Sequence, residues 1–248
     1  MSARPSLFHV ISLDPGGARH RDFAANNAHL GRPEVFQAIR GADIPLAERV
    51  ASGLMTADLT ASGSVTEGSV GCAASHRALW RRIAGSAQGA MILEDDAFTH
   101  PELPDYIAAH RKALDDADIV LFGVNMDSVL ATVSPQGVTS RSGLAPKYPD
   151  AGWIESAFGA TALADVRRHR LLNAFGLCCY WLSPSGAQRL LDGCYPLTLE
   201  PTEIPGVMTR YPGSAIDTRL NAFFPRVEAY VTLPFLAYTP NLDSSTLT

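Results

Sequence analysis

Long apolar runs are missing from this sequence. No segment approaches the roughly 18–20 consecutive apolar residues that a helix needs to cross a bilayer. The first six residues also lack the apolar stretch of a secretory signal. We therefore expect a cytoplasmic protein, and contact with a membrane surface remains an open alternative.

An excess of basic residues is missing as well. The chain has 20 Lys and Arg against 25 Asp and Glu, which gives a net charge of −5. Nucleic-acid binding depends on a basic face that displaces phosphate counterions. We therefore expect no nucleic-acid partner.

Cysteine is scarce, and its spacing matches no common metal or redox motif. The four cysteines are Cys72, Cys178, Cys179 and Cys194, and none of them forms a C-x-x-C pair. This usage indicates reduced thiols of a cytosolic protein.

The sequence contains apolar runs that alternate with helical patterns. Strands are predicted at 7–13, 35–39, 90–93, 118–124 and 176–182. Helices are predicted at 19–30, 69–84, 103–114 and from Ser183 onward. This rhythm predicts a Rossmann-like α/β fold with a mostly parallel sheet flanked by helices.

A single domain over residues 1–248 is expected, since 248 residues with 46% hydrophobic content can bury one sizeable core. Residues 42–69 are predicted to be mostly loop, and residues 125–170, with weak periodicity, to be long loops with a short helix at most. Residues from about 234 to 248 read as a C-terminal tail, either free or folded over a site.

An acidic cluster, Glu94-Asp95-Asp96, directly follows the apolar run 90–93. Ligands of open α/β sheets bind at the carboxyl ends of strands. Mg²⁺ and Mn²⁺ prefer carboxylates together with substrate phosphates. The cluster therefore predicts a metal site facing a diphosphate, with Asp96 as a direct ligand and Glu94 or Asp95 supporting it or holding the ribose. The alternative is a solvated turn or helix start.

Several motifs resemble glycosyltransferase family 25. They are Thr66-Glu67-Gly68-Ser69-Val70-Gly71-Cys72-Ala73-Ala74-Ser75-His76, Ile92-Leu93-Glu94-Asp95-Asp96-Ala97, Val10-Ile11-Ser12-Leu13-Asp14, Phe36-Gln37-Ala38-Ile39-Arg40-Gly41, Tyr180-Trp181-Leu182-Ser183-Pro184-Ser185-Gly186-Ala187 and Ile216-Asp217. The resemblance covers about residues 8–220. The G-C-x-x-S-H and L-E-D-D blocks at this spacing are its most specific parts.

The resemblance implies a GT-A-like fold and a UDP-sugar donor, with galactose as the leading guess. It also implies a Mn²⁺- or Mg²⁺-assisted transfer that inverts the anomeric centre, and an acceptor that is a glycan or a lipooligosaccharide. Ser75 and His76 would then lie at the donor. The alternative for His76 is a buried, hydrogen-bonded histidine on the apolar stripe of its helix.

Arginines and acids elsewhere in the chain complete the candidate site. Arg19 or Arg21 could pair with donor phosphates, or both could be a solvated helix face. Inversion needs a general base for the acceptor hydroxyl. Asp217 is the first candidate for that base, with a further metal ligand or a helix-starting aspartate as alternatives, and Glu155 is the second.

Trp153 and Tyr148 could stack on an acceptor sugar or belong to the core. The basic run 167–170 could meet an anionic glycolipid or form a solvated turn.

Three classes of function fit these residues. The leading hypothesis is a hexosyltransferase that uses a nucleotide sugar. The alternatives are a metal-dependent hydrolase of phosphoesters or glycosides, since paired carboxylates serve either chemistry, and a non-catalytic module that binds nucleotide sugars.

Overall fold

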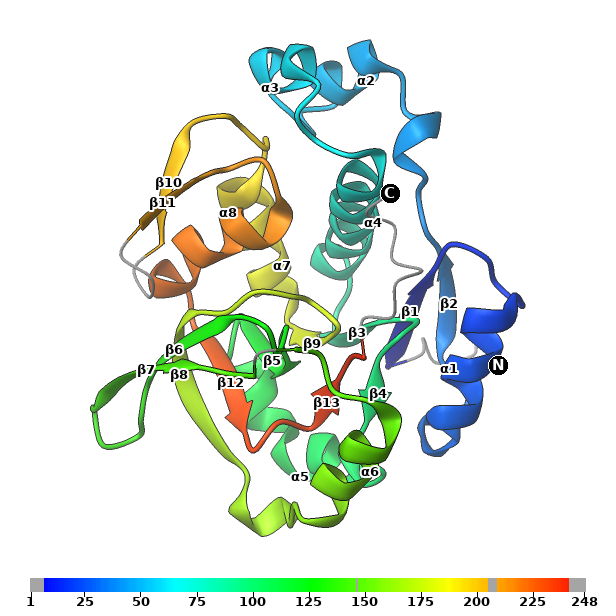
Figure 1. Cartoon of the computed structure of the whole chain (residues 1–248), viewed down its shortest axis with the longest axis vertical. Coiled ribbons are helices and arrows are strands. Elements are labelled where there is room, and N and C mark those ends of the chain that lie inside the picture. The colour runs from blue at the N-terminus through cyan, green and yellow to red at the C-terminus, as the bar shows by residue number, and fades with distance from the viewer. Residues whose placement is uncertain (1–6, 146, 205–208, 241–248) are drawn as a thin grey trace.

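A nine-stranded sheet forms the centre of the molecule, in the strand order β2-β1-β3-β9-β5-β12-β8-β6-β7 (Figure 1). The computed structural model describes residues 7–145, 147–204 and 209–240. The predicted single-domain, Rossmann-like α/β fold is confirmed.

The nine strands of this sheet have the following bounds: β1 Phe8–Ser12, β2 Glu34–Gln37, β3 Ala90–Glu94, β5 Ile119–Gly123, β6 Val129–Val133, β7 Thr139–Gly143, β8 Arg167–Asn173, β9 Cys179–Leu182 and β12 Ala229–Leu233. Two small sheets accompany it. β4 (Phe98–Thr99) pairs antiparallel with β13 (Ala237–Tyr238), and β10 (Pro201–Ile204) pairs antiparallel with β11 (Thr209–Pro212).

Strand direction divides the central sheet. The pairs β2–β1, β1–β3 and β5–β12 are parallel, as the α/β rhythm predicts. The other neighbouring pairs are antiparallel, because β9 enters between β3 and β5 and because β8, β6 and β7 extend the far end as a meander. The sheet is therefore mixed rather than mostly parallel as the sequence predicts, and its parallel part is concentrated around β1.

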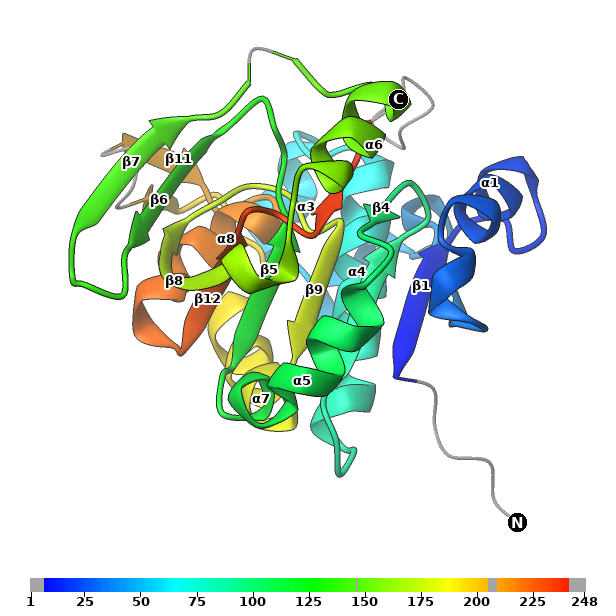
Figure 2. The ribbon, with the colours of Figure 1, turned by 90° about the horizontal axis from the view of Figure 1, so that it is seen from below.

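The helices cover both faces of the sheet. They are α1 Ala18–Asn26, α2 Leu46–Ala51, α3 Ala57–Ser62, α4 Glu67–Ala84, α5 Leu103–Asp115, α6 Ala151–Gly159, α7 Pro184–Cys194 and α8 Ile216–Phe223, with 3₁₀ turns at Ala28–Leu30, Gly41–Asp43, Leu163–Asp165 and Phe224–Arg226. Figure 2 shows α5 on the side of the sheet opposite α7 and α8.

The side chains of β3 alternate between the two faces of the sheet, which explains why helices pack on both faces. Ile92 packs into one apolar cluster with α4, α7 and α8, whereas Met91 and Leu93 pack into a second cluster with α1 and α5. Successive side chains of a strand point to opposite faces. One buried strand therefore holds a helical layer on each side.

The structure contradicts two loop predictions. The stretch 42–69 contains α2, α3 and the first turn of α4. The stretch 125–170 contains β6, β7, α6 and most of β8. In β7 every residue is exposed, so its side chains carry no apolar alternation that sequence reasoning could detect.

The stretch predicted as a C-terminal tail is partly built into the fold. Phe235, Leu236 and Ala237 are buried, and β13 pairs with β4 immediately after the acidic cluster. This corresponds to the alternative in which the segment folds over a site. Residues 241–248 lie outside the described residues.

The basic run 167–170 is part of β8 and is used inside the fold. Arg168 and Arg170 both stack over Tyr230, with their guanidinium carbons 5.3 and 5.7 Å from the ring centroid. Arg170 also pairs with Glu228 at 3.1 Å. The predicted solvated turn is therefore wrong for this segment.

Candidate active site

The acidic cluster sits in a tight turn at the carboxyl end of β3. The Ala97 N–H donates to the Glu94 carbonyl at 3.0 Å, which closes the turn. The side chain of Asn27 braces it from α1, because it donates to the Ala97 carbonyl and accepts from the Thr99 N–H. Asn27 is buried, so this bracing fixes the three acids relative to the sheet.

Asp95 is fully engaged by neighbouring side chains. The Ser12 hydroxyl donates to its Oδ2 at 2.6 Å, and Arg19 Nε lies 2.6 Å from its Oδ1. Asp95 is buried. It therefore anchors Arg19 and the end of β1 and has little capacity left for a ligand.

Asp96 has one oxygen that is not engaged. Arg19 Nη2 lies 3.1 Å from its Oδ2, and Thr239 also hydrogen-bonds its carboxylate. Its Oδ1 is buried and has no hydrogen-bond partner among the described residues. Burial raises the pKa of Asp96 to about 6, with the Glu94 charge adding to the shift. A cation would satisfy this oxygen and reverse that shift.

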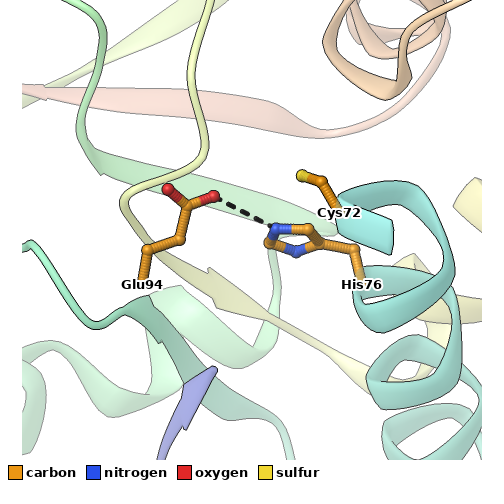
Figure 3. A group of neighbouring side chains, drawn as sticks. All are labelled: Cys72, His76 and Glu94. Carbon is orange, nitrogen blue, oxygen red and sulfur yellow. Dashed lines mark hydrogen bonds and ion pairs between the residues drawn. The ribbon is translucent and has the colours of Figure 1, made fainter. Parts of the chain in front are cut away.

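Glu94 faces helix α4 and joins a polar network there (Figure 3). Its Oε1 lies 3.3 Å from His76 Nε2, and the other ring nitrogen of His76 lies 2.7 Å from the Tyr180 hydroxyl. The Trp80 indole donates to the same hydroxyl at 2.8 Å. His76 is therefore both the buried, hydrogen-bonded histidine of its stripe and a residue of the site.

Cys72 lies one helical turn before His76 on α4 and is close to both His76 and Glu94. Its ligand atom, one from His76 and one from Glu94 lie within 4.8 Å of one another. Burial raises the pKa of the Cys72 thiol well above its ordinary value, and the charges of Glu94 and Asp217 add to the shift.

Asp217, in the first turn of α8, lies close enough to Glu94 for their charges to interact. Its Oδ1 accepts the Thr218 N–H at 2.8 Å. Burial raises the pKa of Asp217, and the Glu94 charge contributes to the rise. The fold thus brings a residue distant in sequence into the electrostatic surroundings of the β3 acids.

A cavity of about 610 Å³ opens beside Cys72, His76, Glu94 and Asp95, whereas Asp96 and Asp217 do not belong to its lining. Its walls are the carboxyl ends of β1, β2 and β3 and the N-terminal half of α4, which lie next to one another in Figure 1. The lining includes Asp14, Arg19, Ser75, His76, Glu94 and Asp95. Ligand cavities of 300–1,000 Å³ are typical of small-molecule sites, so this one has room for a nucleotide.

Two glycines allow α4 to form the wall of this cavity. A Cβ on Gly71 would lie 2.6 Å from the Ile39 carbonyl oxygen, and one on Gly41 would overlap the backbone of Glu67. The first turns of α4 therefore approach the segment after β2 more closely than any side chain would permit.

The remaining predicted residues divide between the cavity and other places. Ser75 lines the cavity, but its hydroxyl donates to Gly71 O at 2.7 Å and accepts from Ile39 N at 2.8 Å, so it holds α4 in place. Arg19 lies at the acids. Arg21 is exposed and donates to the Gly16 carbonyl at 2.5 Å, and it does not line the cavity.

Glu155 is not brought to the acidic cluster. It is exposed on α6 and lines a second cavity of about 690 Å³ together with Phe98, His100 and Phe158. The exposed Trp153 of α6 packs edge-on against Tyr238 of β13, with ring centroids 5.3 Å apart. Glu155 and the β3 acids therefore belong to different parts of the surface.

Sequence reasoning did not single out Ser12, Trp80, Tyr180 and Thr239 as site residues. Ser12 ends an apolar strand, and Tyr180 lies within one, so both look like strand formers. Cys72 had a detectable signal, because it shares one helical face with His76 four residues later.

Comparison with known proteins decides the class of this site. The family model of glycosyltransferase family 25 (LPS biosynthesis protein) matches residues 6–131. The chain belongs to glycosyltransferase family 25. A search of curated proteins gave no match.

The matched range contains the cavity walls from β1 to β3, the G-C-x-x-S-H block of α4 and the acidic cluster. The protein is therefore a glycosyltransferase, which takes a sugar donor and a glycan or lipid acceptor. The segments around Tyr180 and Asp217 lie outside the matched range. Among the described residues, no helix is long and apolar enough to span a bilayer.

Proposed function

We propose that this glycosyltransferase moves a hexose, with galactose as the first choice, from a UDP-sugar to a glycan or lipooligosaccharide acceptor, with inversion and with help from Mn²⁺ or Mg²⁺. The observation that supports metal dependence most directly is the buried, unpartnered Oδ1 of Asp96 beside Glu94. Adjacent carboxylates repel each other unless a cation relieves them.

Glu94 and Asp96 fit a hard divalent cation, because Glu94 lines a nucleotide-sized cavity and the Asp96 carboxylate lies close enough for their charges to interact. Such an ion neutralises charge on the departing nucleoside diphosphate. Asp95 supports this arrangement indirectly, since it holds Arg19 against Asp96. The Arg19 side chain is 36% exposed and lines the cavity, so it can also approach a donor phosphate.

Asp217 is the proposed general base. Inverting transfer requires a group that removes the proton of the acceptor hydroxyl as that oxygen attacks the sugar. Burial raises the pKa of Asp217, which makes its carboxylate a stronger proton acceptor than an exposed aspartate. The proton would pass from the acceptor oxygen to a carboxylate oxygen of Asp217.

The acceptor is proposed to lie on the α6 side of the acids. Thr239 hydrogen-bonds Asp96, and the neighbouring Tyr238 packs against Trp153, whose side chain is 47% exposed. An exposed indole that contacts the residue next to Thr239 offers a stacking surface for a sugar ring.

A thermal-stabilisation screen tests the donor and the metal together. The protein is melted with UDP-, GDP- and CMP-sugars, each with Mn²⁺, with Mg²⁺ or with chelator. A ligand that binds only the native state at 100 times its dissociation constant stabilises it by about 2.7 kcal/mol. We expect stabilisation by UDP-hexoses with metal only. Equal stabilisation in chelator would contradict metal-dependent binding.

UDP release then separates transfer from hydrolysis. The stabilising donor is incubated with a lipooligosaccharide acceptor or with water alone, and released UDP is measured. Transfer predicts turnover that depends on the acceptor. Turnover that ignores the acceptor would overturn the proposed transfer reaction.

A further inference from the structure

Three side chains of different chemistry lie close together in the lining of the first cavity. Cys72 and His76 lie four residues apart on α4, and Glu94 ends β3 (Figure 3). One ligand atom from each lies within 4.8 Å of the other two, and all three residues line the cavity. The group is therefore accessible to a small ion from the cavity.

The distances suit a small ion with four ligands. Zinc binds sulfur at about 2.3 Å and nitrogen or oxygen at about 2.0–2.2 Å, so two ligands of one tetrahedral ion lie roughly 3.3–3.8 Å apart. His76 Nε2 and Glu94 Oε1 are already 3.3 Å apart. The Cys72 sulfur lies within 4.8 Å of both atoms, so a movement of the Cys72 side chain toward them would complete a three-residue set.

The surroundings orient His76 for this role. The Tyr180 hydroxyl lies 2.7 Å from Nδ1, and the Trp80 indole fixes that hydroxyl by donating to it. Nε2 is therefore the nitrogen turned toward Glu94 and the cavity. Histidines that bind metals are commonly held through their second ring nitrogen in this way.

We propose that Cys72, His76 and Glu94 form a binding site for a thiophilic divalent cation such as Zn²⁺. The fourth position would open to the cavity, where water or a donor phosphate could occupy it. Sulfur and imidazole ligands favour zinc over Mg²⁺ and Mn²⁺, so this site differs in selectivity from the proposed Glu94–Asp96 site. Glu94 would be common to both, and zinc would therefore withdraw a ligand from the donor cation.

Cobalt substitution tests the site without relying on activity. The reduced, metal-free protein is titrated with Co²⁺ and followed by absorption spectroscopy, and Zn²⁺ affinity is measured by calorimetry. We expect one equivalent of Co²⁺ with a thiolate-to-cobalt charge-transfer band, and displacement of Co²⁺ by Zn²⁺. An absent thiolate band would overturn the proposal.

Matched variants assign the ligand and separate this site from the hard-cation site. Cys72→Ser should lose the charge-transfer band and bind Zn²⁺ at least about tenfold more weakly. Cys194→Ala changes a buried cysteine of α7 and should keep both the band and the Zn²⁺ affinity. Asp96→Asn should also keep the band, even though it removes a ligand of the proposed donor cation. Unchanged Zn²⁺ affinity in Cys72→Ser would overturn the proposal.

Alkylation of the wild-type protein provides a measurement that does not depend on a variant folding. Cys72 is half-buried, whereas the other three cysteines are buried. Zn²⁺ should protect Cys72 from iodoacetamide at least tenfold in rate, as mapped by mass spectrometry, and Mg²⁺ should not. Equal alkylation with and without Zn²⁺ would contradict thiol ligation.

Discussion

The two ends of the central sheet differ in strand direction and in what they carry. Around β1 the strands β2, β1 and β3 are parallel, so their carboxyl ends meet at one edge, where the first cavity and the acids lie. At the other end β12, β8, β6 and β7 are antiparallel, and their ends alternate between the two edges. The parallel pairing of β2, β1 and β3 therefore brings the polar residues at their carboxyl ends close together.

The family match follows the same division. It covers the parallel region and stops within β6, at residue 131. The antiparallel region contributes the hairpin β6–β7, whose strand β7 is exposed (Figure 2). Helix α6 contributes Trp153 and one wall of the second cavity, whose other wall comes from residues 25–26 and 98–102. We infer that the parallel region determines donor chemistry and that the remaining region determines the acceptor. Four predictions test this separation.

The largest effect is expected from Asp96→Asn in the parallel region. The change removes a carboxylate from the proposed cation site, so metal-dependent donor binding should fall below detection while the fold persists. Calorimetry with UDP-sugar and Mn²⁺, together with circular dichroism, checks both parts. Unchanged donor affinity would break the assignment of the donor site to this end of the sheet.

Asp217→Asn should act on turnover rather than on donor affinity. Loss of a general base typically costs about 10²–10⁴-fold in rate, and kcat should fall by that order with little change in donor KM. Glu155→Gln is the matched control, because Glu155 is exposed and lines the other cavity. Equal losses in kcat and donor affinity would instead indicate a binding role for Asp217.

The sequence predicts the strands and the long helix α4 of the parallel region well for a physical reason, although it misses α2 and α3. Apolar runs such as 90–93 are buried strands, and the helix around Cys72 and His76 has a clear apolar face, so periodicity reports both. The acids that follow 90–93 lie near the cavity, because ligands of α/β sheets bind at the carboxyl ends of the strands. The state of Asp96 cannot be deduced from the sequence. Its Oδ2 pairs with Arg19 and its Oδ1 is buried without a partner, and both facts depend on the folded structure.

The antiparallel region is predicted poorly because its elements have little apolar alternation. β7 is exposed throughout, and β8 begins with the basic run 167–170, in which Arg168 and Arg170 stack on Tyr230. The network of Tyr180 with His76 joins residues 104 positions apart. Neither long-range contacts nor aromatic stacking can be deduced from local periodicity.

The third prediction concerns the pH dependence of stability. Asp96 has an ordinary pKa of 3.8 and a folded-state pKa of about 6, because burial and Glu94 disfavour its charge. Its contribution to stability is therefore fully present below about pH 3.8 and is lost as pH rises through about 6. The difference corresponds to roughly 3 kcal/mol.

Denaturation of metal-free protein across this range checks the effect. Asp96→Asn should be more stable than wild type above pH 6, because it lacks the buried charge, and the two should converge in acid. Mn²⁺ should stabilise the wild type above pH 6 and progressively less below it, since protons then compete for the carboxylate. Parallel stability curves for the two proteins would contradict a raised pKa at Asp96.

The smallest effect is expected from Trp153→Ala on α6. Truncation of an exposed stacking residue should cost about 1.4 kcal/mol, or about tenfold in acceptor KM, with donor KM unchanged. Trp153→Phe should retain most of the affinity, because a flat ring remains, and Leu46→Ala on α2 provides a control at another exposed apolar side chain. A matching rise in donor KM would show that α6 serves the donor as well. The acceptor and donor regions would then not be separable along the sheet.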